Sequence, residues 1–112
     1  MTPTYLDTDE VVQTLLAEYW DKEPQEAHLK NYRFIIFKQD NYGYEGSMHV
    51  LYQDTTDGNL YMVDSSHCSC NGYDWWPRQT PLAFVQSENF PKSWGDLPEW
   101  LKTITREELG CS

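Results

Sequence analysis

A chain of 112 residues is long enough to bury a modest hydrophobic core, and we expect one domain spanning residues 1–112. Its five Trp, eight Tyr and four Phe favour a folded protein over a disordered one. Eighteen acidic residues against eight Lys and Arg give a net charge of -10, which repels nucleic acid and anionic membranes and attracts basic partners. We therefore expect no direct binding to nucleic acid.

The sequence also bears on localisation. Residues 1–10 contain neither a basic start nor an apolar run, and no apolar run in the chain is longer than Phe34–Phe37, which is too short to span a membrane. We expect a cytoplasmic protein without membrane association. In a reducing compartment, Cys68, Cys70 and Cys111 are expected to be thiols or metal ligands rather than partners in disulfides.

A helix is predicted near the N-terminus, and a strand after it. Asp7 or Thr8 is suited to cap the helix, whose apolar face would carry Val11, Val12, Leu15, Leu16 and Tyr19. Residues 21–31, interrupted by Pro24, are expected to form a polar linker. Residues 32–39 contain the Phe34–Phe37 run, which is apolar on both faces of a strand, so we expect this strand in the middle of a sheet.

A β-hairpin is predicted for residues 47–54 and 59–66. Between them, Asp57-Gly58 is the typical signal for a two-residue type I′ turn, because both turn positions need positive φ. The alternation of side chains then puts one set on the core face: Met48, Val50, Tyr52, Tyr61 and Val63. The opposite face receives His49, Leu51, Met62 and Asp64.

The C-terminal part predicts a short fourth strand in residues 80–87 and a terminal helix in residues 96–104. Asp96 would cap this helix with Pro98 in its first turn, while Trp100 and Leu101 would face inward. Together these elements predict an α+β fold, in which the N-terminal helix packs on a mainly antiparallel sheet of three or four strands. The cysteine–tryptophan segment and a short C-terminal helix are expected to close the other side. We expect the core to include Val12, Leu15, Leu16, Phe34, Ile36, Val50, Tyr52 and Val63.

Residues 64–77, DSSHCSCNGYDWWP, bring a histidine, two cysteines and two tryptophans together after the hairpin. Cys68 and Cys70 could supply two ligands of a zinc site, which His67, His49, His28 or Cys111 would have to complete, with His67 the nearest in sequence. Their spacing is shorter than structural zinc sites use and the chain has no second cysteine pair, so we predict no metal cofactor. We expect instead that both cysteines face inward as small apolar residues beside a turn at Gly72.

No catalytic residue is predicted. The acidic surroundings of Cys68 and Cys70 would raise a thiol pKa, whereas a nucleophilic cysteine needs a lowered one. The sequence contains no glycine-rich phosphate loop, no G-x-S-x-G and no H-E-x-x-H. We therefore expect a protein that is not an enzyme.

The run Cys68–Asp74, followed by Trp76 and Pro77, resembles a CSC-x-G-aromatic-acid…W pattern of small uncharacterised proteins of bacteriophages and prophages. The resemblance covers about a dozen residues. It implies an origin in a phage or prophage, and it carries no catalytic residues.

Charge and aromatic content favour an interaction protein, which would inhibit a host protein by binding its basic, nucleic-acid-binding surface. Carboxylates would supply charge complementarity and exposed aromatic side chains would supply anchors, because Tyr and Trp are enriched at interface hot spots. The residues expected to bind are Glu18, Asp21, Glu23, Tyr42, Tyr44, Tyr73, Trp75 and Trp76. Two alternatives are a module stabilised by a metal bound to Cys and His, and a small ligand-binding or enzymatic domain with an aromatic pocket formed by residues 40–46 and 73–76.

Overall fold

The computed structural model describes residues 2–110 and contains a four-stranded antiparallel sheet in the order β2-β3-β4-β6. Its strands are β2 (Tyr32–Tyr42), β3 (Glu45–Asp54), β4 (Leu60–His67) and β6 (Arg78–Thr80). With helices before and after these strands, the structure confirms the predicted α+β class.

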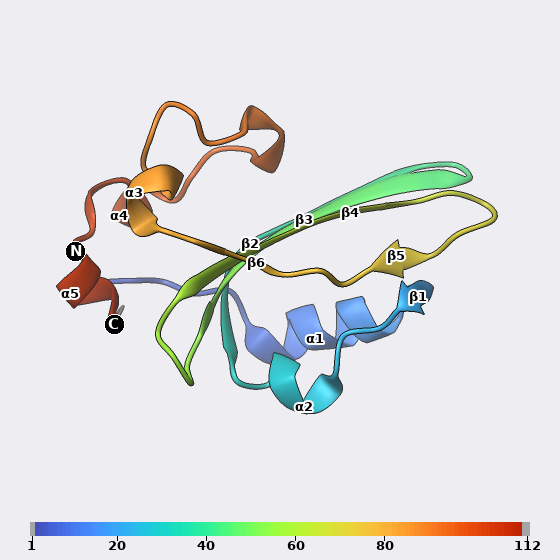
Figure 1. The fold of residues 1–112 in the computed structure, drawn as a ribbon, viewed down its shortest axis with the longest axis horizontal. Helices are drawn as coiled ribbons and strands as arrows, with labels where there is room; N and C mark the ends of the chain where they lie inside the picture. Colours follow the sequence, from blue (N-terminus) through green and yellow to red (C-terminus); the bar gives the residue numbers. More distant parts are fainter. Residues whose placement is uncertain (1, 111–112) are drawn as a thin grey trace.

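The sheet is covered on both faces (Figure 1). What we call the α1 face is covered by α1 (Thr8–Leu16), α2 (Glu26–Leu29) and a parallel pair of strands, β1 (Trp20–Lys22) and β5 (Tyr73–Asp74). The other, the C-terminal face, is covered by α3 (Leu82–Val85), the 3-10 helix η1 (Lys92–Trp94), α4 (Glu99–Thr103) and α5 (Arg106–Leu109). The prediction that the cysteine–tryptophan segment lies on this side is wrong, because the pairing of β5 with β1 places Tyr73 and Trp75 on the α1 face. Each face has its own hydrophobic cluster. No helix within residues 2–110 is long and apolar enough to cross a membrane.

Helix α1 begins as predicted. The Asp7 carboxylate accepts a hydrogen bond from the Glu10 backbone N–H at 3.1 Å, and this cap satisfies one of the free donors of the first turn. Leu15 is buried, but Leu16 is 42% exposed, so its predicted place in the core is wrong. The helix ends at Leu16, and Trp20 folds back so that its indole N–H donates to the Leu15 carbonyl at 2.8 Å, which leaves Leu16 on the outer side.

The predicted polar linker contains two short elements. Residues 21–31 hold most of β1 and all of α2. Strand β1 pairs with β5, which lies some fifty residues further along the chain, with Trp20 opposite Tyr73. A pairing between such distant segments leaves no periodic pattern in the local sequence, and this explains why the linker prediction missed it.

Strand β2 lies at the edge of the sheet, not in its middle as predicted. It is nevertheless covered on both faces, and a bulge between Phe34 and Ile36 shifts the side-chain alternation. Phe34 packs in the cluster of the α1 face, whereas Ile35 and Ile36 both pack in the cluster of the C-terminal face. The continuous apolar run thus reflects two covered faces rather than a central position.

The predicted hairpin is formed by β3 and β4, with Val50 opposite Val63. The predicted division of side chains between the two faces is confirmed for the buried residues, since Val50 and Val63 belong to one cluster and Leu51 to the other. The type I′ turn is wrong, because no residue other than glycine has positive φ within residues 2–110. The chain instead forms a longer loop in which the Gly58 N–H donates to the Asp54 carbonyl at 2.8 Å.

The C-terminal layer differs from the prediction in its boundaries. The fourth strand is β6, and residues 82–85 of the predicted strand form α3 after Pro81, with Leu82 and Val85 buried at helical spacing. Helix α4 has Pro98 rather than Asp96 at its N-cap, although Trp100 and Leu101 are buried as predicted. Helix α5, with a capping box between Thr105 and Glu108, was not predicted.

Gln53 is a buried polar residue on the C-terminal face that links three distant segments. Its Oε1 accepts a hydrogen bond from the Tyr5 hydroxyl at 2.9 Å. Its Nε2 donates to the carbonyls of Gly58 at 3.1 Å and Leu109 at 2.8 Å. The side chain thereby fixes the N-terminal segment, the β3–β4 loop and the end of α5 to one strand.

Gln53→Met should lower the free energy of unfolding by about 1–3 kcal/mol, because the apolar side chain leaves buried hydrogen-bonding groups without a partner. Chemical denaturation measures the loss, and amide hydrogen exchange should accelerate in α5 more than in β3. The same substitution at the exposed Gln79 of β6 is the control and should change stability by about 0.5 kcal/mol or less. Equal effects of the two substitutions would contradict the linking role of Gln53.

Candidate binding surface at the open end of the sheet

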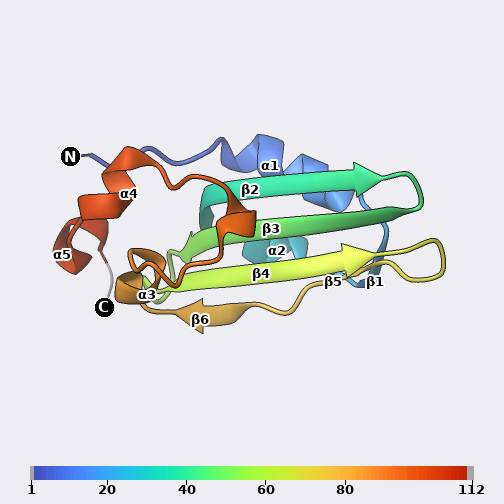
Figure 2. The same cartoon turned by 90° about the horizontal axis from the view of Figure 1, so that it is seen from above.

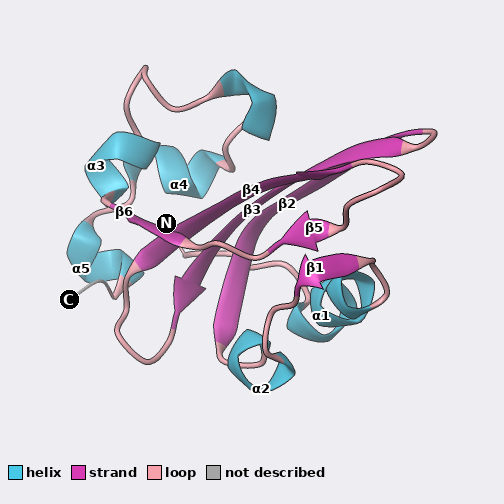
Figure 3. Cartoon of the chain, turned by 45° about the vertical axis from the view of Figure 1, so that its right-hand side comes forward, coloured by secondary structure: helices cyan, strands magenta, loops and turns pink. Residues whose placement is uncertain are grey.

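Strands β2, β3 and β4 extend beyond the C-terminal layer, as Figure 2 shows. The layer ends at η1, where the rings of Trp94 and His49 lie 5.2 Å apart and the Lys38 ammonium donates to the Ser93 carbonyl at 3.1 Å. Beyond this point the sheet is bounded by its own turns and by β1 and β5 (Figure 3). We call the part of the molecule formed by residues 18–22, 40–47 and 66–74 the open end.

A two-residue turn joins β2 to β3 at the open end. Tyr42 pairs with Glu45, and the turn residues are Gly43, with φ of 72°, and Tyr44. Glycine at the first of two turn positions is typical of a type II′ turn, because φ is positive there. Tyr44 is 82% exposed, and Tyr42 is also exposed. Residues 40–46, expected as a pocket loop in one alternative, are therefore the end of a hairpin.

A hollow of about 460 Å³ lies between this turn and the connection from β4 to β5. Its lining combines an aromatic ring, a carboxylate and hydroxyl groups, which suits contact with a polar partner better than enclosure of an apolar ligand. The lining residues are Tyr42, Glu45, Gly46, Ser47, Ser66, His67, Cys68 and Asn71.

The two cysteines lie in a tight turn between β4 and β5. The backbone N–H of Cys68 donates to the Asn71 carbonyl at 3.1 Å, and the N–H of Asn71 donates to the Cys68 carbonyl at 3.3 Å. Cys70 is exposed and Cys68 is half-buried, so the expectation that both face the core is wrong. The physical reason is that the last residue of β4 is His67, and the turn projects beyond the sheet that would have covered the cysteines.

The thiols of this turn interact with each other. Their sulfur atoms lie 3.0 Å apart. A hydrogen bond from the Cys70 thiol, followed by backbone N–H groups of Cys70 and Asn71, lowers the pKa of Cys68. The pKa of Cys70 is raised, mainly because its proton is shared with Cys68. The expected increase in thiol pKa is therefore wrong for Cys68, where the local hydrogen bonds outweigh the nearby carboxylate of Glu45.

His67 does not join the two cysteines. Its ring lies against Tyr73 with 4.6 Å between centroids, and its Nε2 is so close to Gly46 that a Cβ added there would lie 2.5 Å away. Within residues 2–110, no group of three His, Cys, Asp or Glu side chains is placed to hold a metal ion. Cys111 lies outside the described residues.

Carboxylates border the cysteine turn on both sides. The charge of Glu45 acts on the Cys68 thiol, and the charge of Asp21 acts on the Cys70 thiol. Burial raises the pKa of the Tyr73 hydroxyl, and the charge of Glu18 adds to this increase. Glu18 and Asp21 thus lie at the open end, whereas the exposed Glu23 follows β1.

The predicted aromatic anchors are divided between core and surface. Tyr73 and Trp75 are buried in the cluster of the α1 face, so their rings are unavailable to a partner. Trp76 is exposed, and the Lys22 ammonium lies 3.7 Å from its ring centroid. Tyr73 and Trp75 point inward because they are alternate residues of an extended segment. Sequence reasoning missed the exposed Tyr19, which it had placed on the core face of the first helix.

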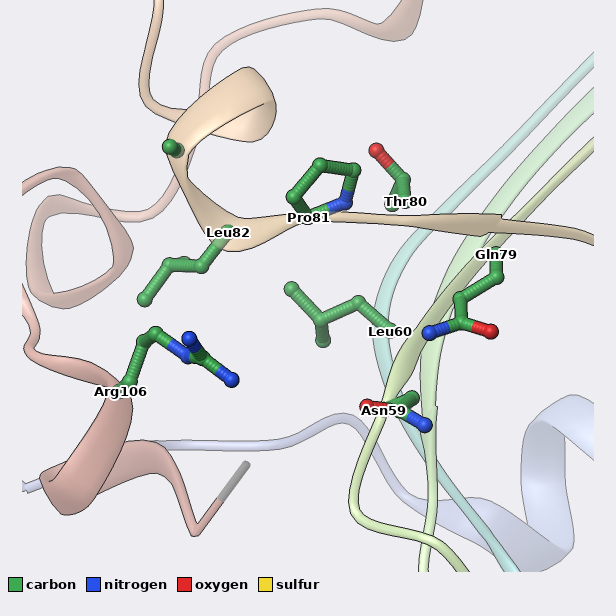
Figure 4. Close-up of a pocket in the computed structure, with 8 residues that line it drawn as sticks. Asn59, Leu60, Gln79, Thr80, Pro81, Leu82 and Arg106 are labelled. Carbon is green, nitrogen blue, oxygen red and sulfur yellow. The ribbon is translucent and has the colours of Figure 1, made fainter. Parts of the chain in front are cut away.

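A second hollow, of about 370 Å³, lies at the opposite end of the sheet between β6, α3 and α5 (Figure 4). Its lining offers nitrogen donors from amides and a guanidinium, but no carboxylate, imidazole or thiol that would serve acid-base or nucleophilic chemistry. The lining residues are Asn59, Leu60, Gln79, Thr80, Pro81, Leu82, Ala83 and Arg106. The open end is therefore the surface of the two that carries carboxylate, imidazole and thiol groups.

Comparison with family models, curated proteins and solved structures gives no match to this chain.

Proposed function

We propose that the protein is a non-enzymatic interaction module whose open end binds a basic surface of a partner protein. The observation that supports this most directly is that the open end carries both exposed tyrosines, on β1's approach and on the β2–β3 hairpin, and the carboxylates of Asp21 and Glu45 beside the cysteine turn. The exposed tyrosines are Tyr19, Tyr42 and Tyr44. The net charge of -10 adds a long-range attraction for a basic partner. The partner we propose is a host protein in the cytoplasm whose basic surface otherwise binds nucleic acid.

Charge and aromatic anchors have different roles in such an interface. Exposed ion pairs contribute only about 0–1 kcal/mol each, although complementary charge accelerates association. Tight binding needs side chains that lose water completely, and single aromatic hot spots reach about 2 kcal/mol or more. Tyr42 and Tyr44 are suited to this role because they project from a two-residue turn held by the β2–β3 pairing.

The experiment is capture of a partner from host lysate with the full-length chain, followed by binding kinetics with the purified partner. Tyr44→Ala should increase the dissociation rate about 30-fold, the equivalent of about 2 kcal/mol. Asp21→Asn with Glu45→Gln should mainly slow association and weaken its dependence on salt.

Matched controls lie at the other end of the molecule. Phe84→Ala removes an exposed aromatic ring from α3, and Glu107→Gln removes an exposed carboxylate from α5. Both should leave the kinetics unchanged. Binding that is indifferent to salt and to all substitutions at the open end, or that responds equally to the controls, would refute the proposal.

A further inference from the structure

We propose that Cys68 and Cys70 form a reversible dithiol–disulfide couple that exchanges with a low-molecular-weight disulfide. Cys68 is the attacking thiolate, and Cys70 is the resolving thiol. This activity is separate from the proposed partner binding, since it needs only the cysteine turn and a small disulfide. Either proposal can fail without the other.

The geometry of the turn favours closure of a disulfide between the two residues. The sulfur atoms are 3.0 Å apart as thiols, and a disulfide bond measures about 2.05 Å, so they need to approach by about 1 Å. Two hydrogen bonds between the backbones of Cys68 and Asn71 already hold the turn closed. Because Cys70 is exposed and Cys68 is half-buried, this movement does not disturb the hydrophobic clusters.

The surroundings of the two sulfurs assign them different roles. The two sulfurs lie 3.0 Å apart, where either thiol can donate to the other, and the Asn71 side-chain amide points toward the Cys68 sulfur from 3.9 Å, so a thiolate at Cys68 can receive both donors. These donors stabilise the thiolate, which is the reactive form in disulfide exchange. Cys70 keeps its proton while it donates to Cys68, so it becomes a nucleophile only after Cys68 has reacted.

The reaction proceeds in two balanced exchanges. The Cys68 thiolate attacks one sulfur of the small disulfide, a bond forms between them, and the other half leaves as a thiolate that takes a proton from solvent. Cys70 then loses its proton to solvent, and its sulfur attacks the Cys68 sulfur. The mixed disulfide breaks, and the second small thiol leaves. Two protein thiols are oxidised by two electrons in total, and one small disulfide is reduced to two thiols.

The test uses the full chain carrying Cys111→Ser, so that only Cys68 and Cys70 react. The protein is equilibrated in glutathione buffers of increasing oxidised fraction, free thiols are blocked with N-ethylmaleimide, and the products are identified by mass spectrometry. In reducing buffers we expect protein with both thiols blocked, and in oxidising buffers protein with an intramolecular disulfide. Little mixed disulfide with glutathione should form. Adding Cys70→Ser should stop the reaction at the mixed disulfide, in which glutathione is attached to Cys68. The amount of this mixed disulfide should be at least about tenfold higher than in the parent protein.

Two further variants test the assigned roles. With Cys68→Ser in the same background, glutathione should attach to Cys70 at neutral pH at least about tenfold more slowly than it attaches to Cys68 in the Cys70→Ser variant. With Cys70→Ala, the pH at which Cys68 alkylation reaches half its maximal rate should move upward, because the donating thiol is lost. A purely structural role for Cys70 would leave this pH profile in place. Unchanged thermal unfolding midpoints would show that the exposed turn tolerates each change.

Three results would overturn the proposal. One is alkylation of Cys68 and Cys70 at equal rates with the same pH profile. Another is persistence of both thiols, or of a mixed disulfide, across the whole range of glutathione buffers. A third is oxidation that yields only disulfides between separate chains.

Discussion

Replacing Trp75 with alanine is expected to lower the free energy of unfolding by about 3–5 kcal/mol, the usual loss for a large buried aromatic side chain. Trp75 is 8% exposed. Its ring lies 5.9 Å from that of Trp20 and stacks on Tyr52 at 6.0 Å between centroids, so the substitution would open a cavity in the cluster of the α1 face. Urea denaturation followed by circular dichroism measures the effect.

The neighbouring tryptophan provides the control. Trp76 is 59% exposed, and the Lys22 ammonium lies 3.7 Å from its ring centroid. Trp76→Ala should therefore cost about 1 kcal/mol or less, the range of an exposed cation–π contact. Similar losses for the two variants would contradict the alternation that turns Trp75 inward and Trp76 outward. The comparison also shows why Trp75 is a poor probe of partner binding, since its replacement weakens the fold.

Gly72→Ala should lower the free energy of unfolding by about 1–3 kcal/mol, the usual cost of adding a carbon atom to a tightly packed site. A Cβ at residue 72 would lie 2.7 Å from Cδ1 of Tyr19 and 2.8 Å from both the Tyr19 carbonyl oxygen and the Asp21 backbone nitrogen. Two of these atoms belong to the backbone beside β5, so β1 itself would have to move. Amide exchange at Tyr73, whose N–H donates to the Tyr19 carbonyl at 2.9 Å, should accelerate along with the loss of stability.

Gly46→Ala is a matched control with equally short contacts of a different kind. A Cβ at residue 46 would lie 2.5 Å from Nε2 of His67 and 2.7 Å from Oδ1 of Asn41. Both are ends of side chains, which can rotate away at a cost of about 1 kcal/mol or less. A larger loss for Gly46→Ala than for Gly72→Ala would show that the cross-strand side chains are more firmly held than the backbone of β1.

Local patterns in the sequence were sufficient to predict the centre of the fold. The alternation around Val50 and Val63 determined which side chains each face of the sheet would receive, and the Asp7 cap marked the start of α1. These features depend on neighbours in the sequence. The burial of Tyr73 could not be predicted in this way, because it results from the pairing of β5 with β1 more than fifty residues earlier.

Prediction of the candidate binding surface was limited in the same way, because it depends on where helices and strands end and on which distant segments pair. Tyr42 and Tyr44 were selected because tyrosine is enriched at interface hot spots, and both are exposed, although the two-residue turn at Gly43 was not predicted. Tyr19 was assigned to the core because its spacing continued the helical pattern beyond the point where α1 ends. Cys68 and Cys70 were assigned to packing from their residue type and from the alternation of side chains at the end of a strand, but β4 ends before them at His67, so that alternation does not apply.

The hydrogen bonds of Gln53 also determine how the molecule can be presented to a partner. They hold Tyr5 near Leu109, the last residue of α5, and Figure 1 shows α5 at the end of the sheet opposite the open end. A linker attached next to either residue would join the molecule at one end of its longest axis, which extends 43 Å, whereas Tyr44 lies toward the other end. Immobilisation on a sensor surface, or display of several copies on one scaffold, would therefore orient every copy with its tyrosines toward solution. Multivalent arrays of this kind would gain avidity for a clustered basic target without any change in the interface itself.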